Sequence, residues 1–204
     1  MNEVEQEFVV DVYDKIAHEF DVTRTYRWSW VTEFMECMSP GSLVYDIGCG
    51  NGRNMTYPDI EFVGIDTCQH FIDICHKNGL NAIKSSMLNI LLPNNTADYI
   101  ICIATFHHLN TYEHRIQALN EMKRLLKPKG KVLLSVWSKT QPKKTKVTFE
   151  KYGDTMVPWK NKLTRYYYIF RVDEIVSLFD DAGFQIFSHV YDCGNEVFVL
   201  GVKS

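Results

Sequence analysis

The sequence lacks every pattern that would direct it to a membrane or out of the cell. No apolar run in its 204 residues approaches the ~20 residues that a membrane-spanning helix needs. The first residues, MNEVEQEF, are acidic and contain no apolar stretch typical of a secretory signal. The six cysteines form no C-x-x-C pair and no spacing typical of a disulfide framework. We therefore expect reduced thiols and a protein of the cytoplasm or nucleus.

Internal repeats and low-complexity tracts are also absent. Because 46% of the residues are hydrophobic, the chain has enough apolar side chains for one full core. We expect a single domain over residues 1–204, in which residues 1–40 form N-terminal helices.

Acidic residues are scarce in one part of the chain. Residues 122–171 hold 14 of the 22 Lys and Arg but only two acids, a net charge of +12 against −15 for the remainder. Such a surplus, interleaved with Tyr152 and Trp159, suits a polyanion such as nucleic acid, although a solvated basic face is the alternative. Within it, residues 138–164 form a long irregular segment, which we expect to lie on the substrate side.

Apolar segments and helical patterns alternate along the rest of the chain. Strands are predicted at 42–48, 61–66, 81–85, 97–105, 131–137, 183–191 and 195–203. Helices are predicted at 4–20, 30–38, 68–77, 113–126 and 172–182. Such alternation implies a mostly parallel sheet with helices on both faces, and the short connection between the last two strands makes the final one antiparallel. This α/β, Rossmann-like arrangement of seven strands is that of class I methyltransferases.

The segment VYDIGCGNG places three glycines, Gly48, Gly50 and Gly52, directly after the first strand. Glycines let the backbone approach a ligand closely, and we expect the N-terminus of a following helix to face that ligand. Dinucleotide sites normally read G-x-G-x-x-G, and this loop has Arg53 where the third glycine would stand. With Asp66 at the end of the second strand as a ribose acceptor, the spacing resembles an S-adenosylmethionine loop.

Two adjacent histidines end the fourth predicted strand, in the segment ICIATFHHLN. His107 and His108 point in different directions and cannot chelate one metal, and their spacing to His114 matches no zinc pattern. We therefore expect no metal site. In this fold the loop lies beside the methyl donor, so we expect His107 to face the substrate and His108 to be structural.

Four separated segments resemble the eukaryotic tRNA methyltransferases that esterify a carboxymethyl group on wobble uridine. They are VYDKIAHEFDVTR, IATFHHL with the helix and strand that follow it, MVPW and RYYYIF. The resemblance implies S-adenosyl-L-methionine as cofactor and the carboxylate of 5-carboxymethyluridine in a tRNA anticodon stem-loop as substrate. It also implies a heterodimer with a small zinc-binding activator subunit of the tRNA methyltransferase 112 type, docked at the edge of the third strand.

The same resemblance assigns roles to single residues. It implies catalytic roles for Arg24, His107 and Tyr166. Asp46 is placed near the methionine amino group, and cofactor binding is expected from Asp46, Gly48, Gly50, Gly52, Asp66, Met87 and Ala104. Substrate binding is expected from Arg24, Trp137, Lys143, Lys144, Arg165 and Tyr167. Arg24 could instead be a surface ion-pair residue, Trp137 a core residue, and the tyrosines could simply pack under the last helix.

The sequence departs from the family at two places. After the third strand, Ser86, Met87 and Leu88 stand where the family usually has an Asp followed by Leu-Pro, which puts the adenine contacts in doubt. Ser138 and Lys139 replace an acidic-glutamine pair after the fifth strand. Two other functions share this fold: a small-molecule methyltransferase, and an inactive RNA-binding subunit. Titration with S-adenosylmethionine separates the inactive subunit from the enzymes.

Overall fold

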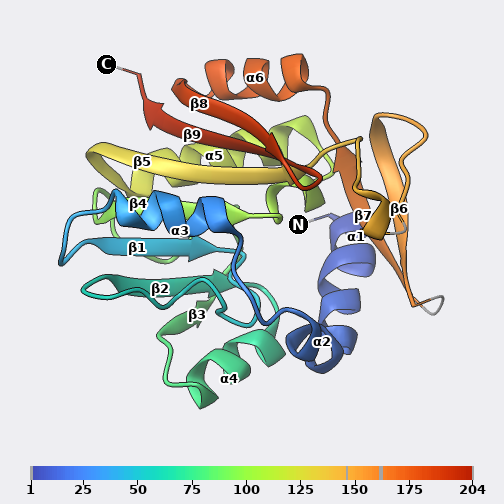
Figure 1. The fold of residues 1–204 in the computed structure, drawn as a ribbon, viewed down its shortest axis with the longest axis horizontal. Coiled ribbons are helices and arrows are strands. Elements are labelled where there is room, and N and C mark those ends of the chain that lie inside the picture. Colours follow the sequence, from blue (N-terminus) through green and yellow to red (C-terminus); the bar gives the residue numbers. More distant parts are fainter. Residues whose placement is uncertain (1, 146, 161–162, 204) are drawn as a thin grey trace.

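The computed structural model of the chain describes residues 2–145, 147–160 and 163–203 (Figure 1). Seven strands form one sheet in the order β3-β2-β1-β4-β5-β9-β8. Their bounds are Leu43–Ile47 (β1), Glu61–Asp66 (β2), Ala82–Lys84 (β3), Ala97–Ile103 (β4), Leu126–Trp137 (β5), Phe184–Asp192 (β8) and Asn195–Val202 (β9). Six of these strands run in one direction, and β9, between β5 and β8, runs antiparallel to them. The predicted sheet is therefore confirmed.

Side chains alternate between the two faces of the sheet and bury a core on each. In β4, Ile100 and Cys102 join the core beneath helices α5 (Tyr112–Leu125) and α6 (Val172–Asp181). Ile101 and Ile103 point the other way, into a core shared with α3 (Ser29–Glu36). Each fully buried Ile or Leu side chain contributes ~1.5–3 kcal/mol, so these two layers hold the fold together. Among the described residues, we find no helix with the length and apolarity required to span a bilayer.

The chain opens with one long helical segment made of α1 (Glu3–Glu5), the π-turn η1 (Gln6–Val10) and α2 (Asp11–Thr23). In Figure 1 it stands across the ends of the strands, beside the hairpin of β6 (Gly153–Trp159) and β7 (Leu163–Ile169). Val12 and Ile16 pack against Trp159 of that hairpin. On its other side Ala17 packs against the turn before α4 (Gln69–Lys77) and against α4 itself. The helix thus bridges both sides of the carboxyl edge of the sheet.

The segment predicted to be irregular contains a regular hairpin. Strands β6 (Gly153–Trp159) and β7 (Leu163–Ile169) pair antiparallel in a separate two-stranded sheet. Tyr167 and Ile169 point to one face and bury a small core with Phe149 and Val157. The prediction of a long irregular segment over 138–164 was therefore wrong for its second half, where an aromatic and β-branched run favours a strand.

The connection from β1 to β2 also differs from expectation. Residues 48–60 form a series of turns, for example with Gly52 N–H donating to Cys49 C=O and Met55 N–H donating to Gly52 C=O. Gly52 has a φ of +77°, which an α-helix does not allow, and Pro58 follows closely. The predicted helix N-terminus facing the ligand was therefore wrong, and only the loop backbone itself can approach one.

Candidate functional site

A cavity of about 830 Å³ opens at the carboxyl ends of the parallel strands. Its walls come from the N-terminal helical segment with the residues that follow it, the glycine loop, the end of β2 with the start of α4, the loops after β3 and β4, the β6–β7 hairpin with the segment that precedes it, and the β8–β9 turn. Doubly wound sheets bind their ligands at this edge. The cavity is also large enough for a cofactor and part of a substrate, since ligand pockets typically measure ~300–1,000 Å³.

The glycine loop and Asp66 form one wall of this cavity. A Cβ on Gly48 would lie 2.2 Å from the Thr105 side chain, so no larger residue fits there. The Asp66 carboxylate accepts one backbone hydrogen bond on each oxygen, from Gly50 N–H and from Cys68 N–H, both at 2.9 Å. Each carboxylate oxygen keeps a further lone pair, so Asp66 can still accept two hydroxyl groups. Gly52 instead faces Leu80 and is not on the cavity wall.

Asp46 lies behind this wall as a buried carboxylate, 1% exposed. Neither of its oxygens has a hydrogen-bond partner among the described residues. Burial raises the pKa of Asp46 to about 7, although the nearby charges of Arg53 and Arg27 oppose that shift. An unpartnered buried carboxylate is costly, and a cationic ligand group would satisfy it.

His108 lies on the cavity wall and is held in one tautomer. Its Nδ1–H donates to the Tyr166 backbone carbonyl at 2.7 Å. Its Nε2 is therefore the acceptor, and the Tyr13 hydroxyl donates to it at 3.0 Å. Burial lowers the pKa of His108 to about 3, so the ring is neutral at physiological pH.

His107 is fully buried and does not line the cavity. Its Nδ1 accepts the Trp137 backbone N–H at 3.1 Å, and its ring stacks on Tyr167 with centroids 4.6 Å apart. The structure thus reverses the expected orientations: His108 faces the cavity and His107 packs inside. Both residues belong to the 3-10 turn η2 (Phe106–His108), where successive side chains point ~120° apart and one residue of offset decides which ring faces the cavity.

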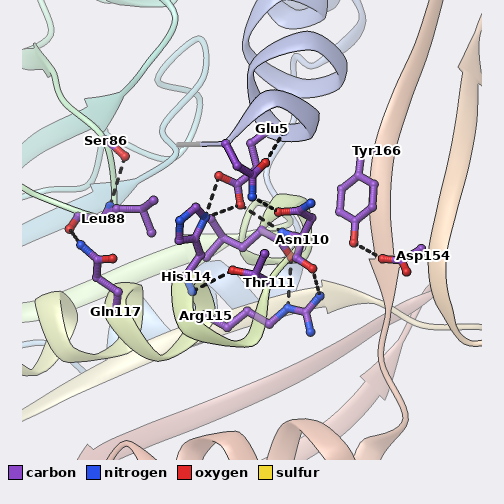
Figure 2. Close-up of polar contacts among 12 residues, drawn as sticks. Glu5, Ser86, Leu88, Asn110, Thr111, His114, Arg115, Gln117, Asp154 and Tyr166 are labelled. Carbon is purple, nitrogen blue, oxygen red and sulfur yellow. Dashed lines mark hydrogen bonds and ion pairs between the residues drawn. The ribbon is translucent and has the colours of Figure 1, made fainter.

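His114, the third histidine of this region, pairs with Glu5 (Figure 2). Glu5 is 2% exposed, and its carboxylate contacts His114 Nδ1 at 2.8 Å and accepts the Asn110 backbone N–H at 3.1 Å. In Figure 2, Arg115 reaches the same loop from α5, where its guanidinium donates to the Leu109 and Asn110 carbonyls. These contacts fix the N-terminal helical segment against the loop that carries His108.

Arg165 brings a buried positive charge to the cavity wall from β7. The side chain is 4% exposed, and its Nη1 donates to the Tyr13 hydroxyl at 3.3 Å. Its Nε has no partner, and no ion pair joins Arg165 to a carboxylate within the described parts of the chain. The rings of Trp159 and Tyr167 lie 4.8 and 5.2 Å from the guanidinium carbon. Arg165 can therefore bind an anion in the cavity.

Most of the other predicted site residues meet at the same cavity. Arg24, Trp137, Tyr167, Met87 and Ala104 all contribute to its wall. Ala104 has a φ of +53°, a strained backbone of the kind that clusters at functional sites.

Besides Asp46, Gly52 and His107, two more predicted residues are not on the cavity wall, Tyr166 and Lys143. Tyr166 turns away from it, and its hydroxyl donates to Asp154. Lys143 is exposed in the short turn η3 (Lys143–Thr145), off the wall. The side chain of Lys144 and the whole of Lys146 lie outside the described residues.

The 14 basic residues of segment 122–171 are divided between two ends of the molecule. Lys123, Arg124, Lys127, Lys129 and Lys131 lie where α5 ends and β5 begins, opposite the cavity. Two of them pair with acids, Arg124 with Glu121 and Lys127 with Asp98. Only the residues from Lys139 onward, with nine of the 14 basic side chains, follow the cavity end of β5.

Sequence reasoning missed Tyr13, Arg27 and Arg53, all of which line the cavity. Tyr13 stands on the apolar face of the opening helix and lies within the matched segment VYDKIAHEFDVTR, which was the available signal. Arg53 packs over Trp28 at 4.4 Å, and burial lowers the pKa of Arg53 to about 10. No local pattern distinguishes Arg27 and Arg53 from surface arginines.

Comparison with known proteins places these features in context. Residues 45–134 match the family model described as a methyltransferase domain. The tRNA (carboxymethyluridine(34)-5-O)-methyltransferase of Schizosaccharomyces pombe is 34% identical, and the alignment covers 95% of each chain. The enzyme of the same name from Mus musculus, ALKBH8, is 39% identical over 68% of this chain, and this chain spans about a fifth (21%) of that relative.

The fold has solved counterparts as well. One is the complex between the Haloferax volcanii Trm112 methyltransferase activator and a methyltransferase. That match has a TM-score of 0.70 at 14% identity, and it covers 97% of this chain and 99% of the other. At that identity the likeness supports the fold alone, and the fold is that of class I methyltransferases.

Proposed function

The chain belongs to the tRNA (carboxymethyluridine(34)-5-O)-methyltransferase family, and from that premise we propose its reaction. It transfers a methyl group from S-adenosylmethionine to the carboxylate of 5-carboxymethyluridine at the wobble position of tRNA, which gives the 5-methoxycarbonylmethyl ester. The observation that carries this proposal is Arg165, a buried guanidinium on the cavity wall without a carboxylate partner among the described residues.

The residues around the glycine loop fit S-adenosylmethionine. Neither oxygen of Asp46 has a hydrogen-bond partner among the described residues, which suits the amino group of the methionine part. Asp66 keeps one lone pair per oxygen for the ribose hydroxyls, and Gly48 leaves no space for a side chain. Ser86 and Met87 line the cavity where the family usually has an acid, and we assign them to the adenine side.

S-adenosylmethionine supplies a methyl group activated by a positive sulfonium. The substrate carboxylate needs no base, because a carboxyl with a pKa near ~4 is already ionised at neutral pH. Arg165 binds and orients this carboxylate, and a charge-assisted hydrogen bond of this kind contributes ~1.5–3 kcal/mol. The Tyr13 hydroxyl links Arg165 to the neutral ring of His108, so the three side chains hold one another in position.

The aromatic wall supports recognition of an extruded base. Trp137 and Tyr167 have ring centroids 4.8 Å apart, and both line the cavity. Enzymes that modify a base take it out of the stack and hold it against aromatic side chains. We assign Trp137 to stacking on the uridine ring. Arg24, which lies over Phe20 at 5.1 Å, is the second cation available to the RNA or the carboxylate.

The tRNA backbone is assigned to the basic residues at the cavity end of the molecule, with Lys143 and Lys151 exposed there. Phosphate contacts of this kind supply affinity that falls with salt.

For the protein partner, we propose a small zinc-binding activator of the Trm112 kind, docked at the β3 edge of the sheet. The edge position of β3 and Leu91, 75% exposed after it, support a docking surface there.

Nucleoside mass spectrometry tests the proposed reaction. Bulk tRNA that carries 5-carboxymethyluridine is incubated with the protein and S-adenosylmethionine, and the methyl ester is quantified. Arg165→Gln is expected to slow ester formation by about 10- to 150-fold, the equivalent of ~1.5–3 kcal/mol, with S-adenosylmethionine affinity within about twofold of wild type. Lys127→Gln removes an equal charge at the far end of the molecule, away from the cavity and from the residues assigned to the tRNA backbone, and serves as the matched control. An active Arg165→Gln variant, or no ester from wild type with its activator, contradicts the proposal.

A further inference from the structure

Three potential metal ligands from distant parts of the sequence meet outside the cavity. Asp14 lies on α2, Cys68 immediately precedes α4, and His70 is its second residue. Their ligand atoms all lie within 4.8 Å of one another. The Asp14 carboxylate is central: Oδ1 contacts His70 Nδ1 at 2.8 Å and accepts from the Cys68 thiol at 3.5 Å. None of the three lines the cavity, so this group is separate from the site described above.

His18 is a candidate fourth ligand, outside the group of three whose ligand atoms lie within 4.8 Å of one another. His18 lies four residues after Asp14, hence on the same face of α2. Its ring centroid is 6.0 Å from that of His70, at an interplanar angle of 61°. Two imidazoles that share a tetrahedral zinc ion have centroids roughly 5–6 Å apart, because the metal–nitrogen bonds are ~2.0–2.1 Å long. The centroid separation is at the upper end of this range, so the His18 ring must turn toward the other three ligands to share an ion with them.

We propose that Asp14, His18, Cys68 and His70 form a binding site for a divalent transition metal of the zinc class. One thiolate, one carboxylate and two imidazoles are ligands that zinc accepts in four-coordinate sites. On binding, the Cys68 thiol loses its proton to solvent, and the thiolate and the carboxylate together balance the 2+ charge. Ligand atoms in such a site are roughly 3.3–3.8 Å apart, which the Asp14–Cys68 contact at 3.5 Å already meets. The Asp14–His70 contact at 2.8 Å must lengthen by about half an ångström, and separations that approach 4.8 Å must shorten by about an ångström.

Side-chain movements of this size are possible at this position. The side chains of Asp14 and His70 are 44% and 48% exposed, so solvent-facing atoms can turn toward an ion without disturbing the core. Without a metal, their contact is a surface ion pair, which contributes little to stability.

The site would connect two parts of the cavity. α2 contributes Tyr13 and Phe20 to the cavity wall, and the Cys68 backbone N–H donates to Asp66, the proposed ribose acceptor. A metal held between α2 and the turn after β2 would therefore tie the N-terminal segment to the cofactor side of the cavity. This consequence rests on the proposed function, whereas the metal site itself does not.

Cobalt and zinc titrations test the site without cofactor or tRNA. The full chain is treated with a chelator, Co²⁺ is added, and the thiolate-to-cobalt charge-transfer band is followed. Zn²⁺ affinity is measured by calorimetry. We expect one equivalent to bind, and Cys68→Ser to abolish the band. His70→Ala is expected to weaken Zn²⁺ binding on the order of tenfold or more, since it removes one ligand.

Controls separate this site from other thiols. Cys37→Ser and Cys193→Ser remove the two exposed cysteines and are expected to leave the band unchanged. If Cys68→Ser does not fold, His70→Ala gives the answer, because its ring is half-exposed and its loss leaves no buried cavity. A band that persists in Cys68→Ser, or wild-type protein that binds no metal, overturns the proposal. Neither result affects the methyl-transfer test.

Discussion

Replacement of Asp46 by Asn is expected to stabilise the free protein and to weaken cofactor binding at the same time. The carboxylate is fully buried, without a hydrogen-bond partner among the described residues, and its pKa is raised to about 7 by burial. When ionised it costs folding free energy, and only a cationic ligand group compensates that cost. An Asn side chain removes the charge and keeps the shape, so the two effects should move in opposite directions.

The magnitude follows from the pKa. A rise from 3.8 to about 7 corresponds to ~4 kcal/mol of destabilisation once the carboxyl is ionised in the folded state, at ~1.4 kcal/mol per unit. The folded state holds the proton more tightly than the unfolded state, so stability from this group is full below about pH 4 and is lost as the pH rises to about 7. An unpaired Asn amide costs ~1–3 kcal/mol in the same place. The net gain of Asp46→Asn is therefore ~1–3 kcal/mol above pH 7.

Urea unfolding followed by circular dichroism measures this gain. At about pH 5.5 the variant should lose much of its advantage over wild type, and at about pH 8 the advantage should be complete. Asp73→Asn, exposed on α4, is the matched control and should show no such pH dependence. Calorimetry with S-adenosylmethionine should show a loss of about tenfold or more for Asp46→Asn. A variant that is less stable than wild type at both pH values would refute the reasoning.

The other predictions concern separate parts of the site. Asp66→Ala should weaken S-adenosylmethionine binding by about 10- to 150-fold in calorimetry, because the ribose hydroxyls lose a charged acceptor worth ~1.5–3 kcal/mol. His108→Ala should cut the methylation rate by tenfold or more (~1.4 kcal/mol) and leave cofactor affinity intact, whereas His107→Ala should mainly lower the unfolding free energy, by ~2–4 kcal/mol in urea denaturation. Lys143→Glu should flatten the salt dependence of tRNA binding, while Lys127→Glu at the far end should not.

The strands and the mostly parallel sheet could be predicted because strand and helix periods differ clearly in this sequence. In β4, consecutive apolar residues from Ile100 to Ile103 serve both faces of a covered parallel strand, which is why the run reads as continuous. The glycine loop and Asp66 were also predictable, since both follow directly from strand ends. The hairpin was missed because LTRYYYI, with three consecutive tyrosines, shows no strict alternation and follows a lysine-rich stretch.

Side-chain direction in irregular segments could not be predicted. Whether His107 or His108 faces the cavity depends on the phase of one 3-10 turn, and that phase is set by the Trp137 backbone and the Tyr166 carbonyl, far away in sequence. The same holds for the group of Asp14, Cys68 and His70, whose members only meet once α2 packs on α4. Such arrangements depend on tertiary contacts, which the spacing of residues along the sequence does not reveal.

The charges around the cavity bear on which nucleophile the site can accept. The pKa values of both histidines are lowered by burial, that of His108 to about 3, so neither ring adds a positive charge at neutral pH. Arg165 then supplies the buried cation on the hairpin wall. An amine substrate would arrive protonated, would be repelled by Arg165, and would need a base to release its lone pair. A carboxylate is attracted to Arg165 and reacts without losing a proton. These electrostatics favour methylation of an acid over methylation of an amine in this cavity.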